Sequence, residues 1–182
     1  MIETATRWVV ETYTANAPHL TNSLEWLDRI APESAEAVRI ATLTHDMERA
    51  FPGTDAPIWN GDEDYDYYVA HSNRSARIVG AWLRAAGCGT EFVTETEELI
   101  KVHEFGGWPE ADLVQAADSL SFLDVNVDLF LGYARSGKFR YDQVRAKFVY
   151  SRDRIRIPWV KELSEPMLDS ALARLDRQQS AS

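Results

Sequence analysis

The sequence predicts an all-α protein that folds as one domain of about six to eight helices. Apolar residues recur three to four positions apart along most of the chain, which is the period of an amphipathic helix. Proline and glycine interrupt this pattern, and no stretch shows the strict alternation typical of a β-strand. At 182 residues the chain is long enough to bury a core. We therefore expect one domain over residues 1–178, followed by a frayed Ser/Gln/Ala tail over 179–182.

The predicted helices are separated by residues that stop helical structure. Pro32 ends the first helix, Pro52 follows the second, and Gly87 ends the third. Pro109 suits the first turn of the fifth helix. The stretch PGTDAPIWNGDED reads as a loop between the second and third helices. The predicted helices cover approximately 20–30, 38–51, 65–86, 94–104, 111–133, 141–155 and 160–175.

The chain is acidic, with a formal net charge of -10, and it has one cysteine. This charge argues against binding to a nucleic-acid polymer or to an anionic membrane, because both repel a negative surface. Cys88 alone cannot form an intrachain disulfide and fits a reducing compartment. We see no signal peptide and no membrane-spanning run, so we expect a soluble, cytoplasmic protein. The long aromatic-rich helices are also compatible with a homodimer.

An adjacent histidine and aspartate, His45-Asp46, lie near the end of the run AVRIATLTHDMERAF. Two ionisable side chains in such a run cost desolvation energy unless a partner holds them, and a metal ion is one such partner. Asp118 lies in another apolar run, ADLVQAADSLSFL, where a carboxylate needs a cation or strong donors. Imidazole and carboxylate ligands favour transition metals over calcium. Three more histidines fall on or beside other predicted helices: His19, His71 and His103.

The order His, His-Asp, Asp resembles the signature of the HD-domain superfamily, a metal-dependent all-α fold. HLTNSLEWLDRIA is similar to its first helix, RIATLTHDMERAF to its run ending in His-Asp, and LVQAADSLSFLD to its late helix. The resemblance covers roughly residues 17–125. It implies a single HD-type domain in which metal is bound by His19, His45, Asp46 and Asp118.

His71 and His103 match the subset of that superfamily that carries two metals. This subset includes dinucleoside-tetraphosphate hydrolases, cyclic-dinucleotide phosphodiesterases and diiron oxygenases that act on inositol or phosphonates. The interval of 15 residues from His103 to Asp118 is more similar to that of the tetraphosphate hydrolases. The chain has no Gly-Tyr-Pro motif, which argues against the phosphodiesterases. Where many relatives follow His-Asp with Gly-Lys, this chain continues MER, and we expect Arg49 to replace the lysine near the substrate.

A basic segment, RSGKFRYDQVRAKFVYSRDRIR at 135–156, stands out in this acidic chain. It holds eight Lys or Arg against two Asp, a local charge of +6. Arg140, Lys147 and Arg154 recur every seven residues, so a helix would align them. They would bind an anionic substrate through phosphate or carboxylate groups, or else pair with acidic parts of the protein or of another subunit.

The resemblance implies two divalent transition-metal ions, iron or manganese, with Asp46 bridging them. We expect a phosphohydrolase that attacks a small phosphate ester or nucleotide through a metal-activated water, with Asp46, Arg49 and Glu104 in catalytic roles. Glu104 and Glu48 are each open to a second interpretation, as solvated carboxylates at helix ends. The alternatives are a diiron oxygenase acting on a small polyol or phosphonate, and a non-catalytic ligand-binding module. An acidic run, either solvated or a lid over the site, comprises Asp62, Glu63, Asp64 and Asp66.

Overall fold

The computed structural model of the protein describes residues 1–58 and 65–181, which form helices and no strands. The all-α prediction is therefore confirmed. The described part holds nine α-helices, and because α6 and α7 are joined by a π-helical turn they make eight separate helical segments. The α-helices are α1 (Ile2–Thr12), α2 (Ala17–Ile30), α3 (Glu36–Thr44), α4 (Tyr65–Ala85), α5 (Thr90–Lys101), α6 (Pro109–Ser121), α7 (Val127–Arg135), α8 (Tyr141–Asp153) and α9 (Pro158–Ser180).

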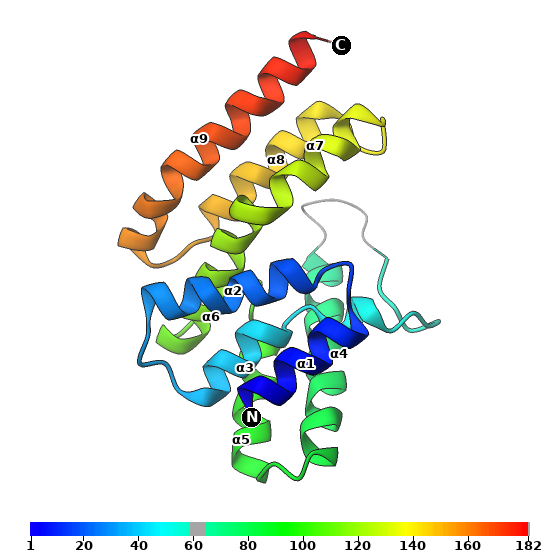
Figure 1. The fold of residues 1–182 in the computed structure, drawn as a ribbon, viewed down its shortest axis with the longest axis vertical. Coiled ribbons are helices and arrows are strands. Elements are labelled where there is room, and N and C mark those ends of the chain that lie inside the picture. Colours follow the sequence, from blue (N-terminus) through cyan, green and yellow to red (C-terminus); the bar gives the residue numbers. More distant parts are fainter. Residues whose placement is uncertain (59–64, 182) are drawn as a thin grey trace.

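The helices form two packed groups. The first group, α1–α6, surrounds a core that includes Leu20, Ile40 and Leu83. The second group, α7–α9, lies above it in Figure 1 and packs around Phe148 and Leu175. A smaller apolar cluster on α6, α9 and the α8–α9 connection joins the two groups. The long segment α6–α7 runs from one group into the other and so connects them.

Most predicted helix boundaries follow from proline and glycine. Pro109 occupies the first turn of α6 as predicted, and Pro158 does the same in α9. The backbone of Gly87 has φ +81°, a conformation that side chains other than glycine rarely adopt, and α4 ends just before it. None of the described helices is both long enough and apolar enough to cross a membrane.

The structure also differs from the predicted elements. Helix α1 was not predicted. The second predicted helix is shorter than expected, because α3 ends at Thr44 and a 3₁₀ turn, η1 (Met47–Ala50), follows the His-Asp pair. Helix α9 continues to Ser180, into the predicted tail. The acidic residues Asp62, Glu63 and Asp64 lie outside the described residues, whereas Asp66 is exposed in the first turn of α4.

The segment predicted as one helix over 111–133 contains a π-helical turn, η2 (Phe122–Asn126). A π turn inserts a residue into the helical register, and such turns are frequent at functional sites. Asp124 in this turn accepts hydrogen bonds from Trp26 Nε1 (3.0 Å) and Asn22 Nδ2 (3.2 Å) on α2. These bonds fix the turn against the helix that carries His19.

Candidate metal centre

Two of the four histidines follow the ends of helices, and this position fixes which ring nitrogen carries a proton. His45 follows α3, and its Nδ1 donates to the carbonyl of Thr42 (2.9 Å). His103 follows α5, and its Nδ1 donates to the carbonyl of Ile100 (2.8 Å). The last carbonyls of a helix lack partners within it, so each imidazole satisfies one of them. In the neutral ring, Nε2 then keeps its lone pair for a ligand.

His19 on α2 is held in the same tautomer, with the proton on Nδ1, by a serine. The hydroxyl of Ser121 donates to the carbonyl of His19 (2.8 Å), and His19 Nδ1 lies 3.0 Å from that Oγ. Because the hydroxyl proton is already used, Nδ1–H donates to Oγ and Nε2 is left unprotonated in the neutral ring. The interval from His19 to Ser121 spans 102 residues, so this arrangement depends on the packing of α2 against the end of α6.

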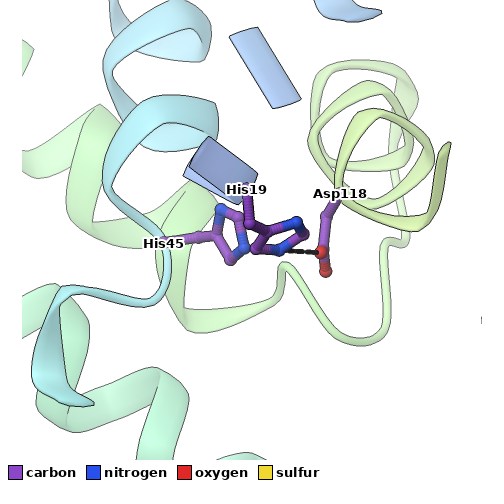
Figure 2. Close-up of side chains that lie close together, drawn as sticks. All are labelled: His19, His45 and Asp118. Carbon is purple, nitrogen blue, oxygen red and sulfur yellow. Dashed lines mark ion pairs between the residues drawn. The ribbon is translucent and has the colours of Figure 1, made fainter. Parts of the chain in front are cut away.

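The Nε2 atoms of His19 and His45 both face the carboxylate of Asp118 on α6. They lie 3.1 Å and 3.4 Å from its Oδ1. Figure 2 shows the two rings and the carboxylate pointing toward one another. All three side chains are buried, and their ligand atoms are close enough together to contact one ion.

The other two histidines face two further carboxylates. His71 Nε2 lies 3.2 Å from His103 Nε2 and 3.4 Å from Glu104 Oε1. Asp46 Oδ1 lies 3.6 Å from His71 Nε2 and 3.9 Å from His103 Nε2. His71, His103 and Glu104 could hold one ion, and a third grouping, His45 with Asp46 and His103, connects the two sides. The six predicted ligands thus lie together, and Glu104 joins them.

The carboxylates of Asp46, Glu104 and Asp118 each direct one oxygen toward histidines and the other toward an arginine. Arg49 Nη1 donates to Asp46 Oδ2 (2.5 Å). Arg154, the residue that caps the end of α8, pairs with Oε2 of Glu104 and Oδ2 of Asp118. Glu104 is buried with Arg154 as its partner, so its interpretation as a solvated helix-end carboxylate is wrong. Arg154 is also the cation that the burial of Asp118 requires.

The arginines set the ionisation of the carboxylates. Burial alone would raise the pKa of Asp118 and Glu104, but Arg154 holds the pKa of both groups well below the usual range. Burial likewise works against ionisation of Asp46, but Arg49 and the nearby imidazoles lower the pKa of that carboxyl below its usual range. Three carboxylates are therefore ionised at neutral pH and are ready to act as ligands.

The imidazoles of His45 and His103 are shifted in opposite directions. Burial would lower the pKa of His45, but Asp118 and Asp46 beside it raise the pKa to about 9. Burial and the neighbouring charge of His45 lower the pKa of His103 to about 3. In the metal-free protein at neutral pH, His45 therefore holds a proton that a metal ion would displace.

This proton makes metal affinity depend on pH. Below about pH 9, binding must release the His45 proton. Burial and Arg49 act to lower the pKa of His71, but the carboxylates around it raise that pKa above its usual value. We therefore expect the apparent affinity to rise at least about tenfold per pH unit up to pH 9. His103 adds no dependence there, because its lowered pKa leaves it neutral. Calorimetric titration with Mn²⁺ in two buffers of different ionisation enthalpy should show at least one proton released per chain at pH 7. Equal heats in the two buffers would contradict this.

The ligand cluster opens into a cavity of about 370 Å³ between the two helix groups. Arg49, Lys147 and Arg154 line this cavity, as the prediction of an anion-binding site requires. Arg140 does not line it. It precedes α8 as its N-cap, outside the helical register that aligns the other two, and its exposed side chain pairs with Asp142 (2.9 Å). The aromatic lining consists of Tyr13, Tyr67, Tyr68, Phe122, Phe130, Tyr133 and Phe139.

Several lining residues were not predicted from the sequence. Tyr13 follows the unexpected helix α1, and Phe122 begins the π turn that the sequence did not indicate. Lys138 belongs to the predicted basic segment but not to its seven-residue series, and its Nζ lies 3.7 Å from the centre of the Tyr133 ring. The signal that could have found Lys138 is its place in the short turn between α7 and α8.

The residues present fit transition-metal ions. His45 Nε2 is buried and has no hydrogen-bond partner among the described residues, although it faces Asp118. A metal ion bound here would replace the proton that this nitrogen carries in the metal-free protein. Imidazole nitrogens with carboxylate oxygens form a donor set that iron, manganese, nickel and zinc accept.

No protein-family model, curated protein or solved structure matches the chain.

Proposed function

We propose that the chain is a metal-dependent phosphohydrolase of the HD-domain superfamily, acting on a small phosphate ester or nucleotide. The observation that carries the proposal is the cavity, which joins the buried ligand cluster to a set of cationic side chains. The order of the ligands along the chain, His19, His45-Asp46 and Asp118, supports the superfamily. His71 and His103 support its two-metal subset.

Charge balance favours an anionic substrate. The carboxylates of Asp46, Glu104 and Asp118 outnumber the guanidinium groups of Arg49 and Arg154 by one. Two divalent ions would change the net charge of this cluster from negative to positive. Lys138 and Lys147 add further positive charge on the cavity wall. A phosphate group placed there would balance this excess and accept hydrogen bonds from the cations.

Metal ions bound by these residues would supply Lewis acidity and lower the pKa of a water molecule toward neutrality. The protein's own groups orient the reaction. Arg49 and Arg154 border the cavity while they hold the ligand carboxylates in place, and Lys147 lies on the same wall. Developing charge on phosphate oxygens would be stabilised by these cations.

Glu104 is better suited to bind metal than to accept a proton. Its pKa is lowered by Arg154, and a carboxylate with a lowered pKa is a weak base. Its Oε1 faces the Nε2 atoms of His71 and His103 (3.4 and 3.8 Å). We therefore assign Glu104 as an additional ligand beside those two histidines.

The test of this function is phosphate release by the metal-loaded protein. Mn²⁺-, Co²⁺- and Fe²⁺-loaded samples are incubated with a panel of nucleotides and phosphomonoesters, and inorganic phosphate is measured. Metal-dependent release that chelation abolishes is the expected result. If the iron form consumes oxygen with a panel of polyols and phosphonates and releases no phosphate, the result would favour the oxygenase instead. Tight binding without turnover would favour the ligand-binding module.

A further inference from the structure

Glu48 is a buried carboxylate beside the ligand cluster that no step of the proposed hydrolysis uses. It lies in η1, two residues after Asp46, and its side chain is only 4% exposed. Its interpretation as a solvated carboxylate is therefore wrong. It does not line the cavity, so it has no route to a substrate there. A buried charge in this position needs a reason to be retained.

The imidazole of His71 explains why the buried charge of Glu48 is retained. The other three histidines each have an acceptor for Nδ1–H, namely Ser121, Thr42 and Ile100. His71 Nδ1 is buried and has no hydrogen-bond partner among the described residues. Glu48 Oε1 lies 3.5 Å from it, slightly beyond hydrogen-bond distance. If Nε2 of His71 binds a metal ion, Nδ1 must carry the proton, and Glu48 is placed to accept it.

Arg74 holds Glu48 in this orientation. It lies one turn after His71 on α4, and its Nη1 donates to Glu48 Oε2 (2.9 Å) and to the Glu48 carbonyl (2.7 Å). The backbone amide of Glu48 donates to Ser75 Oγ (3.0 Å). Glu48 is thus neutralised on one oxygen and fixed at its backbone. The other oxygen, Oε1, faces the imidazole of His71 at 3.5 Å and lies 3.8 Å from Arg49 Nε.

We infer that Glu48, held by Arg74, is the positioning residue for His71, and that it fixes the ring so that Nε2 faces the metal ion. This inference rests on the metal centre of the proposed function but not on the phosphate chemistry. A carboxylate that accepts the second N–H of a ligand imidazole fixes the ring and raises its basicity. Removing such a group typically weakens metal binding about 10–100-fold.

The test compares Glu48→Ala, Glu48→Gln and Arg74→Met with a matched control, Arg77→Met. Arg77 lies on the same helix and shares the partner Asp55 with Arg74, but it is exposed and does not contact Glu48. Mn²⁺ affinity and stoichiometry are measured by titration, and the visible spectrum of the Co²⁺ form reports ligand geometry. We expect Glu48→Ala and Arg74→Met to weaken one of two sites about 10–100-fold and to alter the Co²⁺ spectrum.

Glu48→Gln keeps an acceptor oxygen and the side-chain shape, so its loss of affinity should be smaller than that of Glu48→Ala, and it keeps the test valid if the alanine variant does not fold. Arg77→Met should bind Mn²⁺ with the affinity and stoichiometry of the wild-type protein. Wild-type affinity at both sites and an unchanged Co²⁺ spectrum in Glu48→Gln and Arg74→Met would overturn the inference. If the wild-type protein binds no metal, the metal centre itself fails and the inference fails with it. Absence of phosphatase activity in a protein that binds two ions would contradict only the proposed function.

Discussion

Asp46→Asn should lower the metal content from about two ions per chain to one or none, and should reduce turnover about 1,000-fold or more. Asp46 Oδ1 faces the Nε2 atoms of His71 and His103, and the same side chain groups with His45. It is therefore the carboxylate best placed to contact both sides of the cluster. Asparagine has nearly the same shape but no charge, so it cannot serve as an anionic ligand between two ions.

The measurements are metal content by elemental analysis and phosphate release at saturating metal. Asp128→Asn is the control, because Asp128 is an exposed carboxylate that pairs with Arg174, away from the centre. Thermal unfolding of both variants should be compared, since Asp46→Asn also removes the partner of Arg49. Two ions per chain with more than about a tenth of wild-type turnover would contradict the bridging role.

Arg154→Met should destabilise the metal-free protein by about 3–5 kcal/mol. Arg154, Glu104 and Asp118 are each less than a tenth exposed, and the arginine pairs with both carboxylates. Its removal leaves two buried negative charges without that cation. The arginine caps the end of α8 and the carboxylates belong to the first helix group, so the contact between the two groups should weaken as well.

Metal ions should restore much of the stability that Arg154→Met loses, because they bind the native state and neutralise the same carboxylates. Urea unfolding of Arg154→Met, Arg154→Lys and the control Arg156→Met, each with and without Mn²⁺, measures the effect. Arg156 is half-exposed and pairs with Asp112, so its variant should remain close to wild type. A metal-free Arg154→Met protein as stable as wild type would show that Arg154 does not balance the charge of the carboxylates.

The sequence predicted the helical class, and candidate ligands at His45, Asp46 and Asp118, because these features have local signals. The period of the apolar residues predicts helices, and His45-Asp46 is an ionisable pair in an apolar run. The burial of Asp118 could also be predicted, since the residues around it are apolar. That His19 and Ser121 meet across 102 residues could not be read from the sequence, although the resemblance placed both segments in one site.

The remaining features depend on tertiary packing and carry little local signal. The π turn at Phe122–Asn126 breaks no apolar pattern, so the sequence predicted one continuous helix. Glu48 and Glu104 look like ordinary helix-end carboxylates until Arg74 and Arg154, from other helices, are seen beside them. Arg140 fits a seven-residue series but precedes the helix that would align it.

The most direct test is elemental analysis of the untagged protein, purified without chelators and then reconstituted with iron or manganese. We predict about two transition-metal ions per chain, held by His19, His45, Asp46, His71, His103 and Asp118, with Glu104 beside them. Only trace metal after reconstitution, in a protein that is folded by circular dichroism, would contradict it.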